Sequence, residues 1–325
     1  MIDARLQKSN GESAFEWKLR CCKAKINHET DMDWQEISDM LELGVTGDHL
    51  RKTAYGMLEY DEYIHSENGV STTILSISDL HYPFAKDVGE LSKYANKIDV
   101  LQLNGDLMDC SSISKFVCYY RSSPIDEIIG CRDYLIALIT MLKPKKVIAN
   151  YGNHELRLGA HLATKLDNEL QELMPMTALD YIFQDGFTHF NRANGTKTKY
   201  SPLCDVFPDI EFIYDGKWYS QVGDTIFCHP RAFSSAPLKT AEKAMYWFRN
   251  EGFSFKTIVM AHTHRLGYYK IGNSAIYEQG AFCDTDRMNY TDGSLVNSQK
   301  QGYIVIRQNQ NGETIQDKID LVSLN

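Results

Sequence analysis

The feature of the chain that most limits its fold is a series of five short apolar runs after residue 70, each ending in a small group of polar residues. The runs are rich in β-branched side chains, which is typical of buried strands. Helical patterns such as that of residues 127–142 lie between several of them, and a sixth run begins at Gly302. Alternating strands and helices predict an α/β domain. The five runs span residues 72–78, 99–104, 146–151, 224–228 and 257–261.

The polar groups that follow these runs have the side chains of a metal site. Loops at the carboxyl ends of neighbouring strands converge on one crevice, so residues far apart in the sequence can meet there. Gly105 and Gly152 allow the tight turns that bring the next side chain into the crevice. Carboxylates, imidazoles and amide oxygens bind divalent ions such as Mn²⁺, Fe²⁺, Zn²⁺ or Mg²⁺. The groups are Asp79-Leu-His81, Gly105-Asp106-Leu-Met-Asp109, Gly152-Asn153-His154-Glu155, Cys228-His229 and Ala261-His262-Thr-His264.

The spacing within the groups predicts how two ions are shared among them. Asp79 and His81 are one residue apart, so on an extended strand end both side chains point to the same side. The same holds for His262 and His264. The two oxygens of the Asp106 carboxylate can bridge two ions. We therefore expect one ion to be held by Asp79, His81, Asp106 and His264, and the other by Asp106, Asn153, His229 and His262.

Two ions about 3.5–4 Å apart bind phosphate oxygens, lower the pKa of a shared water and stabilise the charge that builds at phosphorus during in-line attack. His154 follows the predicted ligand Asn153 and is the candidate general acid for the leaving oxygen. Asp109 is the candidate carboxylate that fixes the tautomer of His154. We expect the site to bind two divalent ions and to prefer Mn²⁺ over Fe²⁺, Zn²⁺ or Mg²⁺.

The prediction of a metal site rests on the five groups taken together and not on any one of them. A single Asp-x-His match is common by chance, and an isolated histidine such as His161 or His189 is usually an ordinary surface or core residue. However, five of the ten histidines fall within the five groups, and each group ends a predicted strand. A purely structural explanation of the set is therefore disfavoured.

The five groups resemble, in their order along the chain, the signature of the calcineurin-like metallophosphoesterase family over about residues 70–310. Written as motifs, the groups are Asp-x-His, Gly-Asp-x-x-Asp, Gly-Asn-His-Glu, a lone His and x-His-x-His. The resemblance implies a four-layer α/β/β/α sandwich with a dinuclear metal centre, the ligands assigned above, and hydrolysis of phosphate esters. Cys110 stands where the Ser/Thr protein phosphatases of the family carry Arg, which argues against a protein phosphatase. Pro230 and Ala261 stand beside predicted ligands where the family usually has Gly.

Residues 1–68 are predicted to form a helical segment, followed by a metallophosphoesterase domain over residues 69–325. Asp33 and Thr46 are expected to be N-caps of two helices with a Gly-containing turn between them, which is the outline of a helix-turn-helix. The segment fits DNA binding, packing on the main domain, or assembly into a homo-oligomer. Residues 1–65 hold thirteen acidic and eight basic residues, which weakens the case for DNA binding.

Two local features resemble particular members of the family. Gly105-Asp-Leu-Met-Asp109 is similar to the motif of the Mre11/SbcD nuclease branch. The N-terminal segment resembles the leader of phage and prophage phosphoesterases, which would place the protein in a phage-infected bacterial host.

Residues 157–208 are predicted to be an insertion over the active face. An amphipathic helix is expected at Leu158–Leu173, followed by an irregular stretch at residues 191–200. Arg192, Lys197 and Lys199 in this insertion could contact a polyanion, but an ordinary solvated loop is the favoured interpretation.

Composition narrows the class of protein further. The net charge of −9 argues against a protein that coats nucleic acid by bulk electrostatics. It does not exclude a nuclease, because metal-binding carboxylates add to the negative count. No apolar run is long enough to span a bilayer, and the N-terminus lacks the apolar stretch of a signal peptide. The eight cysteines are scattered without a Cys-x-x-Cys pair. We expect a cytoplasmic protein with reduced thiols and no membrane partner.

Three functions remain in competition. The first is a phosphodiesterase acting on nucleic acid, a DNA nuclease in which a metal-bridging hydroxide attacks phosphorus. Its candidate base-stacking residues are Tyr119, Tyr120, Tyr268 and Tyr269. The alternative is a small-molecule phosphoesterase for cyclic nucleotides, dinucleotides or a phosphomonoester, with the insertion as a lid. The third is a non-enzymatic DNA-binding or assembly protein, against which the complete ligand set argues.

Overall fold

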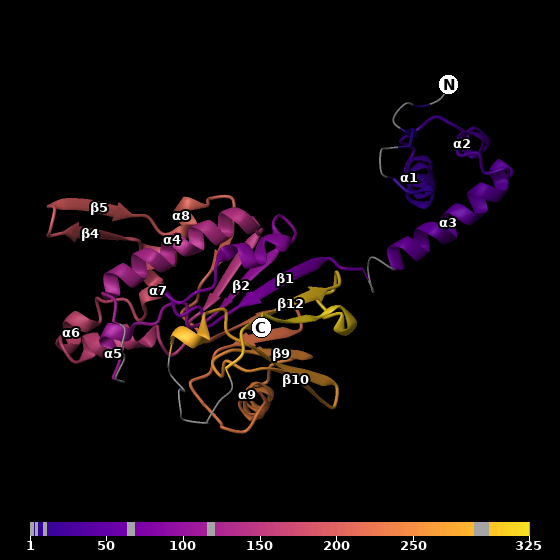
Figure 1. Cartoon of the computed structure of the whole chain (residues 1–325). Coiled ribbons are helices and arrows are strands. Elements are labelled where there is room, and N and C mark those ends of the chain that lie inside the picture. Colours follow the sequence, from indigo (N-terminus) through magenta and orange to yellow (C-terminus); the bar gives the residue numbers. More distant parts are fainter. Residues whose placement is uncertain are drawn as a thin grey trace. The chain divides into compact units, whose positions relative to one another are not determined.

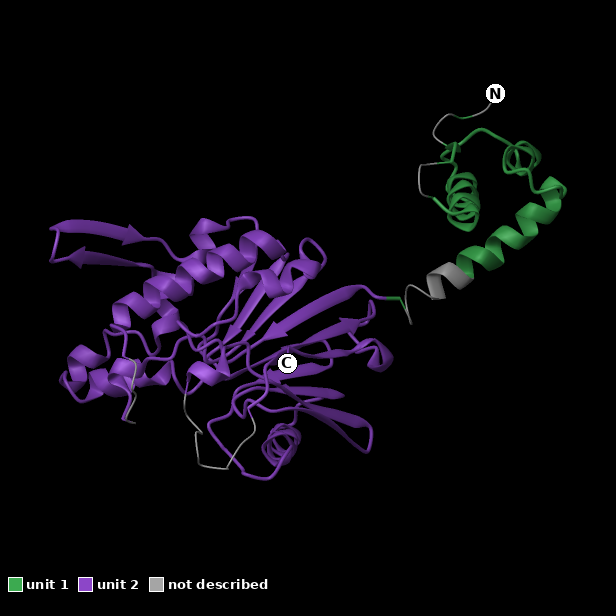
Figure 2. Ribbon diagram, viewed as in Figure 1, with its two compact units in different colours: residues 1–69 green, residues 70–325 purple. Residues whose placement is uncertain are grey.

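The computed structural model describes residues 3, 6–8, 12–63, 69–115, 121–288 and 299–324, with residues 60–63 as backbone alone. The chain divides into two compact units, Met1–Gly69 and Val70–Asn325, shown in different colours in Figure 2. No helix in this described part of the chain is long and apolar enough to cross a membrane.

The first unit contains three helices around a small apolar core, which confirms the predicted helical segment. Ser13 and Asp33 begin two of the helices with capping boxes, each completed by a glutamate three residues later. The Thr46 hydroxyl accepts a hydrogen bond from the His49 N–H at 3.3 Å at the start of the third. Gly44, with φ 65°, allows the turn between the last two helices. The helices are α1 (Ala14–Ile26), α2 (Trp34–Met40) and α3 (Gly47–Tyr63).

The basic residues of α3 are already paired within the helix. Asp48 forms ion pairs with Arg51 at 2.9 Å and with Lys52 at 2.6 Å. A phosphate backbone would have to compete with this carboxylate for both cations.

The second unit is built on two mixed sheets, and the six strands predicted from the sequence are all present (Figure 1). The six-stranded sheet has the order β13-β12-β1-β2-β3-β6, in which β1, β2 and β3 are parallel neighbours. The five-stranded sheet has the order β10-β11-β9-β8-β7. The strands of the first sheet are β1 (Thr72–Ile77), β2 (Val100–Asn104), β3 (Lys146–Asn150), β6 (Glu211–Ile213), β12 (Gly302–Gln308) and β13 (Asp320–Ser323); those of the second are β7 (Tyr219–Val222), β8 (Thr225–Cys228), β9 (Thr257–Met260), β10 (Leu266–Ile271) and β11 (Ser274–Gln279).

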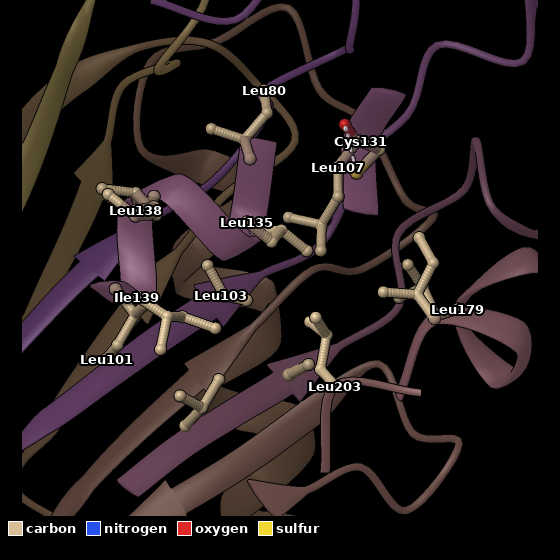
Figure 3. Packing of buried hydrophobic residues seen from close by; sticks show 14 of the residues in the cluster. Leu80, Leu101, Leu103, Leu107, Cys131, Leu135, Leu138, Ile139, Leu179 and Leu203 are labelled. Atoms are coloured by element: carbon tan, nitrogen blue, oxygen red, sulfur yellow. Dashed lines mark hydrogen bonds between the residues drawn. The ribbon is translucent and has the colours of Figure 1, made fainter. Parts of the chain in front are cut away.

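Three apolar clusters hold these sheets in four layers. Ile74, Phe227 and Ile304 belong to the cluster between the two sheets. Helix α4 (Pro124–Leu142) packs its buried face on the six-stranded sheet, as Figure 3 shows for the leucines of this cluster. Helix α9 (Lys239–Asn250) covers the five-stranded sheet. The predicted α/β/β/α sandwich is therefore confirmed.

The segment predicted to be an insertion differs from expectation in two places. The single helix expected at Leu158–Leu173 is two helices, because the chain turns after Ala163 and Asp167 caps a new start. The irregular stretch is a β-hairpin, in which the Asn191 carbonyl accepts from the Gly195 N–H at 2.9 Å. The elements are α5 (Leu156–Ala163), α6 (Asn168–Gln171), α7 (Ala178–Asp180), the π-helical turn η5 (Tyr181–Asp185), β4 (Phe187–Asn191), β5 (Thr196–Tyr200) and α8 (Leu203–Val206).

Much of this segment belongs to the core rather than to a lid. Leu179 and Leu203 pack in the same cluster as α4 (Figure 3). Helix α5 borders the predicted active face, since Leu156 and Arg157 line a groove beside Asn153. Short 3₁₀ turns complete the unit at η3 (Val88–Tyr94), η4 (Ser111–Ile113), η6 (Thr285–Arg287) and η7 (Gln316–Lys318).

Candidate metal centre

The five polar groups come together because the two sheets present their strand ends to one another. Strands β1, β2 and β3 of one sheet and β8 and β9 of the other each lead into one group. Buried asparagines at the ends of β2 and β3 fix the two sheets together beneath the groups. The Asn150 amide donates to the Phe227 carbonyl at 3.1 Å, and the Asn104 amide donates to the Cys228 carbonyl at 3.3 Å. The side chains that follow are therefore held at one place.

The backbone of five predicted ligands is left-handed rather than extended. Strand β1 ends at Ile77 and β9 at Met260, so the expectation that alternation along a strand end aims the paired ligands was wrong. The chain instead turns sharply after each strand, which brings both members of a pair to the same side. Left-handed backbone costs a non-glycine residue roughly 1–3 kcal/mol and is concentrated at functional sites. The residues in this conformation are Asp79 (φ 52°), His81 (44°), Asp106 (51°), His262 (81°) and His264 (51°).

Two glycines let ligand side chains pass close to the backbone. A Cβ on Gly105 would lie 2.5 Å from Nδ1 of His229, and a Cβ on Gly152 would overlap the Asp106 carboxylate. Gly105 also has φ 85°, as the predicted tight turn requires. Gly105 is therefore needed both for the turn and for the close approach, whereas Gly152, whose φ is not positive, is needed for the close approach alone.

The first ligand group consists of Asp79, His81 and His264, all buried. The Nε2 atoms of the two histidines are 3.0 Å apart. Both face Oδ1 of Asp79, at 3.8 Å from His81 and 3.2 Å from His264. Ligand atoms bound to one ion at about 2.1 Å lie roughly 3.0–3.5 Å from each other. The three atoms therefore surround a point that suits a cation.

The second group consists of Asp106, His229 and His262. Oδ2 of Asp106 lies 3.2 Å from Nε2 of His229, and the same oxygen lies 3.9 Å from Nε2 of His81 in the first group. Oδ1 of Asp106 instead accepts the His154 backbone N–H at 2.8 Å. If two ions are bound, Oδ2 is therefore the Asp106 oxygen that would lie near both ligand groups, whereas we had expected both oxygens to take part.

Three predicted ligands have a buried polar atom with no hydrogen-bond partner among the described residues, namely Oδ1 of Asp79, Oδ1 of Asn153 and Nε2 of His229. Such atoms are costly to bury, and a bound cation satisfies them. His229 is oriented for this role, because its other ring nitrogen is 2.9 Å from the Asn104 carbonyl oxygen. The residues thus fit two divalent ions, although the assignment of each ligand stays a prediction.

The electrostatics of the groups favour deprotonated ligands at most positions. Burial alone would raise the pKa of Asp79, but the facing His264 and His229 lower it to about 2. Burial and the neighbouring imidazole of His154 lower the pKa of His81 to about 4. His229 and His264 behave differently. The Asp106 carboxylate outweighs burial and raises the pKa of His229 to about 10, and the Asp79 carboxylate raises the pKa of His264. A proton favoured on these imidazoles would have to be displaced by a bound ion.

His154, the candidate general acid, is held from its Nδ1 side. Nδ1 lies 2.8 Å from the backbone carbonyl oxygen of Asp109 and 3.3 Å from Oδ1 of the same residue. Asp109 Oδ1 is also 3.4 Å from Nδ1 of His81. Asp109 therefore contacts both the candidate acid and a predicted ligand, and its carbonyl makes the shorter contact with His154.

Two residues of the site had no role in the sequence-based prediction. Glu155 is fully buried and accepts backbone N–H groups from both ligand loops: Asp106 at 3.0 Å, Leu107 at 2.7 Å, Met108 at 3.1 Å and Gly152 at 2.7 Å. Arg157 donates to the Asp109 carbonyl at 2.7 Å and contacts Nε2 of His154 at 2.9 Å. The fourth residue of Gly-Asn-His-Glu could have indicated Glu155, whereas nothing in the spacing indicated Arg157.

Two of the candidate stacking tyrosines, Tyr268 and Tyr269, are described by the structure and are not part of this centre. Tyr268 and Tyr269 lie exposed on β10, and Tyr268 stacks on Tyr277 with ring centroids 5.2 Å apart. Tyr119 and Tyr120 lie outside the described residues.

Comparison with solved structures returns proteins of low sequence identity. Wild-type Vps29 of Entamoeba histolytica, complexed with zinc, is 12% identical over 78% of this chain and 99% of its own, with a TM-score of 0.37. An archaeal phosphodiesterase is 11% identical over 78% and 99%, with a TM-score of 0.38. A metallophosphoesterase of Sphaerobacter thermophilus is 12% identical over 78% and 88%, with a TM-score of 0.36. No curated protein matches the chain.

The family model for the calcineurin-like phosphoesterases matches residues 72–266, which is more than half of the chain and includes all five polar groups. The match begins with β1 and ends at Leu266, just beyond His264. The two His/Asp ligand groups are what a metal-dependent hydrolase of phosphate esters requires. The chain therefore belongs to the calcineurin-like phosphoesterase family.

Proposed function

We propose that the chain is a two-metal phosphodiesterase that cleaves nucleic acid as a DNA nuclease, with Mn²⁺ as the preferred ion. The observation that carries the two-metal part is the position of Asp106, whose Oδ2 lies 3.2 Å from Nε2 of His229 in one ligand group and 3.9 Å from Nε2 of His81 in the other. A single oxygen between two ligand groups is the arrangement that holds two ions close together.

A groove beside the centre supports a polyanionic substrate. The groove has a volume of about 540 Å³ and is lined by the cations Lys115, Arg157 and Arg231 together with Asn153. Arg231 forms no ion pair with any of the described residues. Three cations gathered here, in a chain of net charge −9, favour phosphates on either side of the cleaved bond.

The residues of the chain have distinct roles in the proposed reaction. Bound divalent ions would supply Lewis acidity and a hydroxide near neutral pH. Arg157 and Arg231 orient the substrate phosphates in the groove. His154 donates a proton to the leaving oxygen, and Asp109 holds its ring through Nδ1. Glu155 keeps the two ligand loops in register through their backbone N–H groups.

The direct test is cleavage of labelled single- and double-stranded DNA with Mn²⁺. The wild-type chain should cut DNA, and His154→Ala should not. His189→Ala, on β4 and away from the centre, is the matched histidine control and should cut normally. Turnover of small phosphoesters without any cleavage of DNA would rule out the nuclease and support the second function below.

The second candidate is a phosphoesterase for cyclic nucleotides, dinucleotides or a phosphomonoester. The limited volume of the groove favours this second function, because a ligand of one or a few nucleotides would fill such a space. A screen with cyclic and linear dinucleotides and a phosphomonoester, run beside the DNA assay, separates the two functions by their kcat/KM values.

A further inference from the structure

An aromatic pocket lies beside the predicted metal ligands and has no role in the reaction described so far. It has a volume of about 380 Å³. We call it the aromatic pocket and define it by Tyr151, Trp218, Pro230, Ala232, Ala244 and Trp247.

Three residues of the aromatic pocket adjoin predicted metal ligands along the chain or through a backbone hydrogen bond. Tyr151 directly precedes Gly152 and Asn153, and Pro230 directly follows His229. The Trp218 carbonyl accepts the His229 backbone N–H at 2.8 Å. A ligand in this pocket would therefore lie next to two predicted ligands of the second ion, Asn153 and His229.

The pocket presents partly exposed aromatic surface. Trp218 and Trp247 lie with ring centroids 5.2 Å apart and planes at 56°. The side chain of Trp247 is 42% exposed, although Phe248 beside it is fully buried. Tryptophan surface left open next to a phosphate-binding centre is suited to a flat ring, because bases stack on aromatic side chains whatever their sequence.

The charges around the pocket indicate the rest of the ligand. Arg231 lines both the aromatic pocket and the cationic groove, and Lys243 lines the pocket. A molecule that fills the aromatic pocket and reaches the metal centre must therefore combine a planar apolar ring with phosphate. This combination is a nucleotide.

The position of His154 decides which part of a nucleotide substrate occupies the pocket. Arg157, which contacts His154, lines the groove but not the aromatic pocket. The leaving group, protonated by His154, therefore belongs in the groove. We infer that the aromatic pocket binds the base of the nucleoside that stays on the phosphoryl group, an inference that rests on the proposed phosphodiesterase function.

Two esters with the same leaving group test this inference. The p-nitrophenyl ester of thymidylate and methyl p-nitrophenyl phosphate both release p-nitrophenol, but only the first carries a base. Trp247→Ala removes stacking surface, and Ala232→Trp fills the pocket from an exposed position without removing an aromatic ring. Each variant should raise KM for the thymidylate ester about tenfold, the effect of losing one stacked base, and change KM for the methyl ester less than about twofold. Tyr269→Ala removes another exposed aromatic ring, on β10, and should change neither value.

A binding measurement separates failure of this inference from failure of the proposed function. Calorimetric titration with thymidylate and with methyl phosphate, with and without Mn²⁺, should show that the base adds affinity in the wild type but not in Ala232→Trp. If both esters are hydrolysed and the two pocket variants leave KM for the thymidylate ester unchanged, the pocket assignment is wrong and the phosphodiesterase stands. Equal increases in KM for both esters would also show that the pocket assignment is wrong. If neither ester is hydrolysed but the base-dependent binding is lost in Ala232→Trp, the phosphodiesterase fails and the base site stands.

Discussion

The guanidinium of Arg157 contacts the imidazole of His154, with Nη2 of the arginine 2.9 Å from Nε2 of the histidine. Arginine only donates hydrogen bonds, so Nε2 must accept, and the proton of the neutral ring lies on Nδ1, which faces the Asp109 carbonyl. Donation to a leaving oxygen needs a second proton, on Nε2, which the ring can take up from water only when Arg157 no longer occupies this nitrogen. Arg157 must therefore leave Nε2 when substrate binds, and a phosphate in the groove gives it an alternative partner.

This exchange predicts a specific effect of replacing Arg157. Arg157→Ala removes a phosphate contact and should raise KM for DNA about tenfold while lowering the slope of log KM against log salt by about one. Arg157→Lys should recover part of the affinity, because lysine keeps the charge but lacks the planar fork. Lys165→Ala, at an exposed position after α5, is the control for nonspecific loss of charge. An unchanged salt dependence in Arg157→Ala would show that this side chain does not contact phosphate.

The loss of kcat caused by His154→Ala should depend on the leaving group of the substrate. On DNA, whose leaving sugar oxygen needs a proton, His154→Ala should lower kcat by about 10²–10⁴-fold. On a p-nitrophenyl ester, whose leaving group departs without a proton, the loss should be below about tenfold. Steady-state rates of one variant on both substrates check this prediction. Equal losses on both substrates would assign His154 to phosphate binding or structure and not to proton transfer.

The bridging position of Asp106 predicts the metal content of two carboxylate variants. Asp106→Asn should bind less than about one Mn²⁺ per chain, because one oxygen serves both ligand groups. Asp79→Asn should keep about one ion, since only the first group loses a ligand. Mass-spectrometric metal analysis after gel filtration gives the ratio, with His189→Ala expected to hold about two ions. Two ions retained by Asp106→Asn would contradict the single-oxygen bridge.

The sheets could be predicted from sequence because buried strands carry a strong local signal. The six predicted runs match β1, β2, β3, β8, β9 and β12 to within one residue at each end. The hairpin of β4 and β5 was missed although Asn194-Gly195 is a turn signal, because the surrounding lysines and threonines have no apolar alternation. Edge strands such as β10 and β13 pair through backbone atoms with little burial of their side chains, so their sequences carry no comparable pattern.

The residues that gather at the site could also be predicted, but not the way the backbone presents them. Polar groups at strand ends were enough to bring Asp79, His81 and His264 together. Their left-handed backbone could not be predicted, because surrounding tertiary contacts stabilise a conformation that local propensity disfavours. The role of Arg157 depends on the distance from α5 to Asp109, which sequence spacing does not contain.

Burial around the centre predicts that its cysteines are inert. Burial raises the pKa of the Cys110, Cys228 and Cys283 thiols above the usual range, and it raises that of Cys21 to about 11. Cys204 is the one described cysteine whose side chain is partly exposed. Brief alkylation of the native chain at neutral pH should therefore label Cys204 ahead of the six buried cysteines, as peptide mass spectrometry would show. Equal labelling after unfolding in urea is the control, and early labelling of Cys228 would mean that the sheet opens.

Glu155 should be among the most sensitive positions for stability, because one carboxylate serves four backbone N–H groups of two loops. Glu155→Ala leaves these buried donors without partners, which should lower the free energy of unfolding by about 3 kcal/mol or more. Glu155→Gln keeps the shape and one acceptor oxygen but loses the charge, so its loss should be smaller. Urea unfolding of the metal-free chain measures both, with the exposed Glu172→Ala expected to change stability by less than about 0.5 kcal/mol. Because the same N–H groups belong to Asp106 and Gly152, the alanine variant should also bind Mn²⁺ more weakly in a calorimetric titration. Full metal affinity in a destabilised Glu155→Ala chain would show that the ligand loops keep their arrangement without this carboxylate.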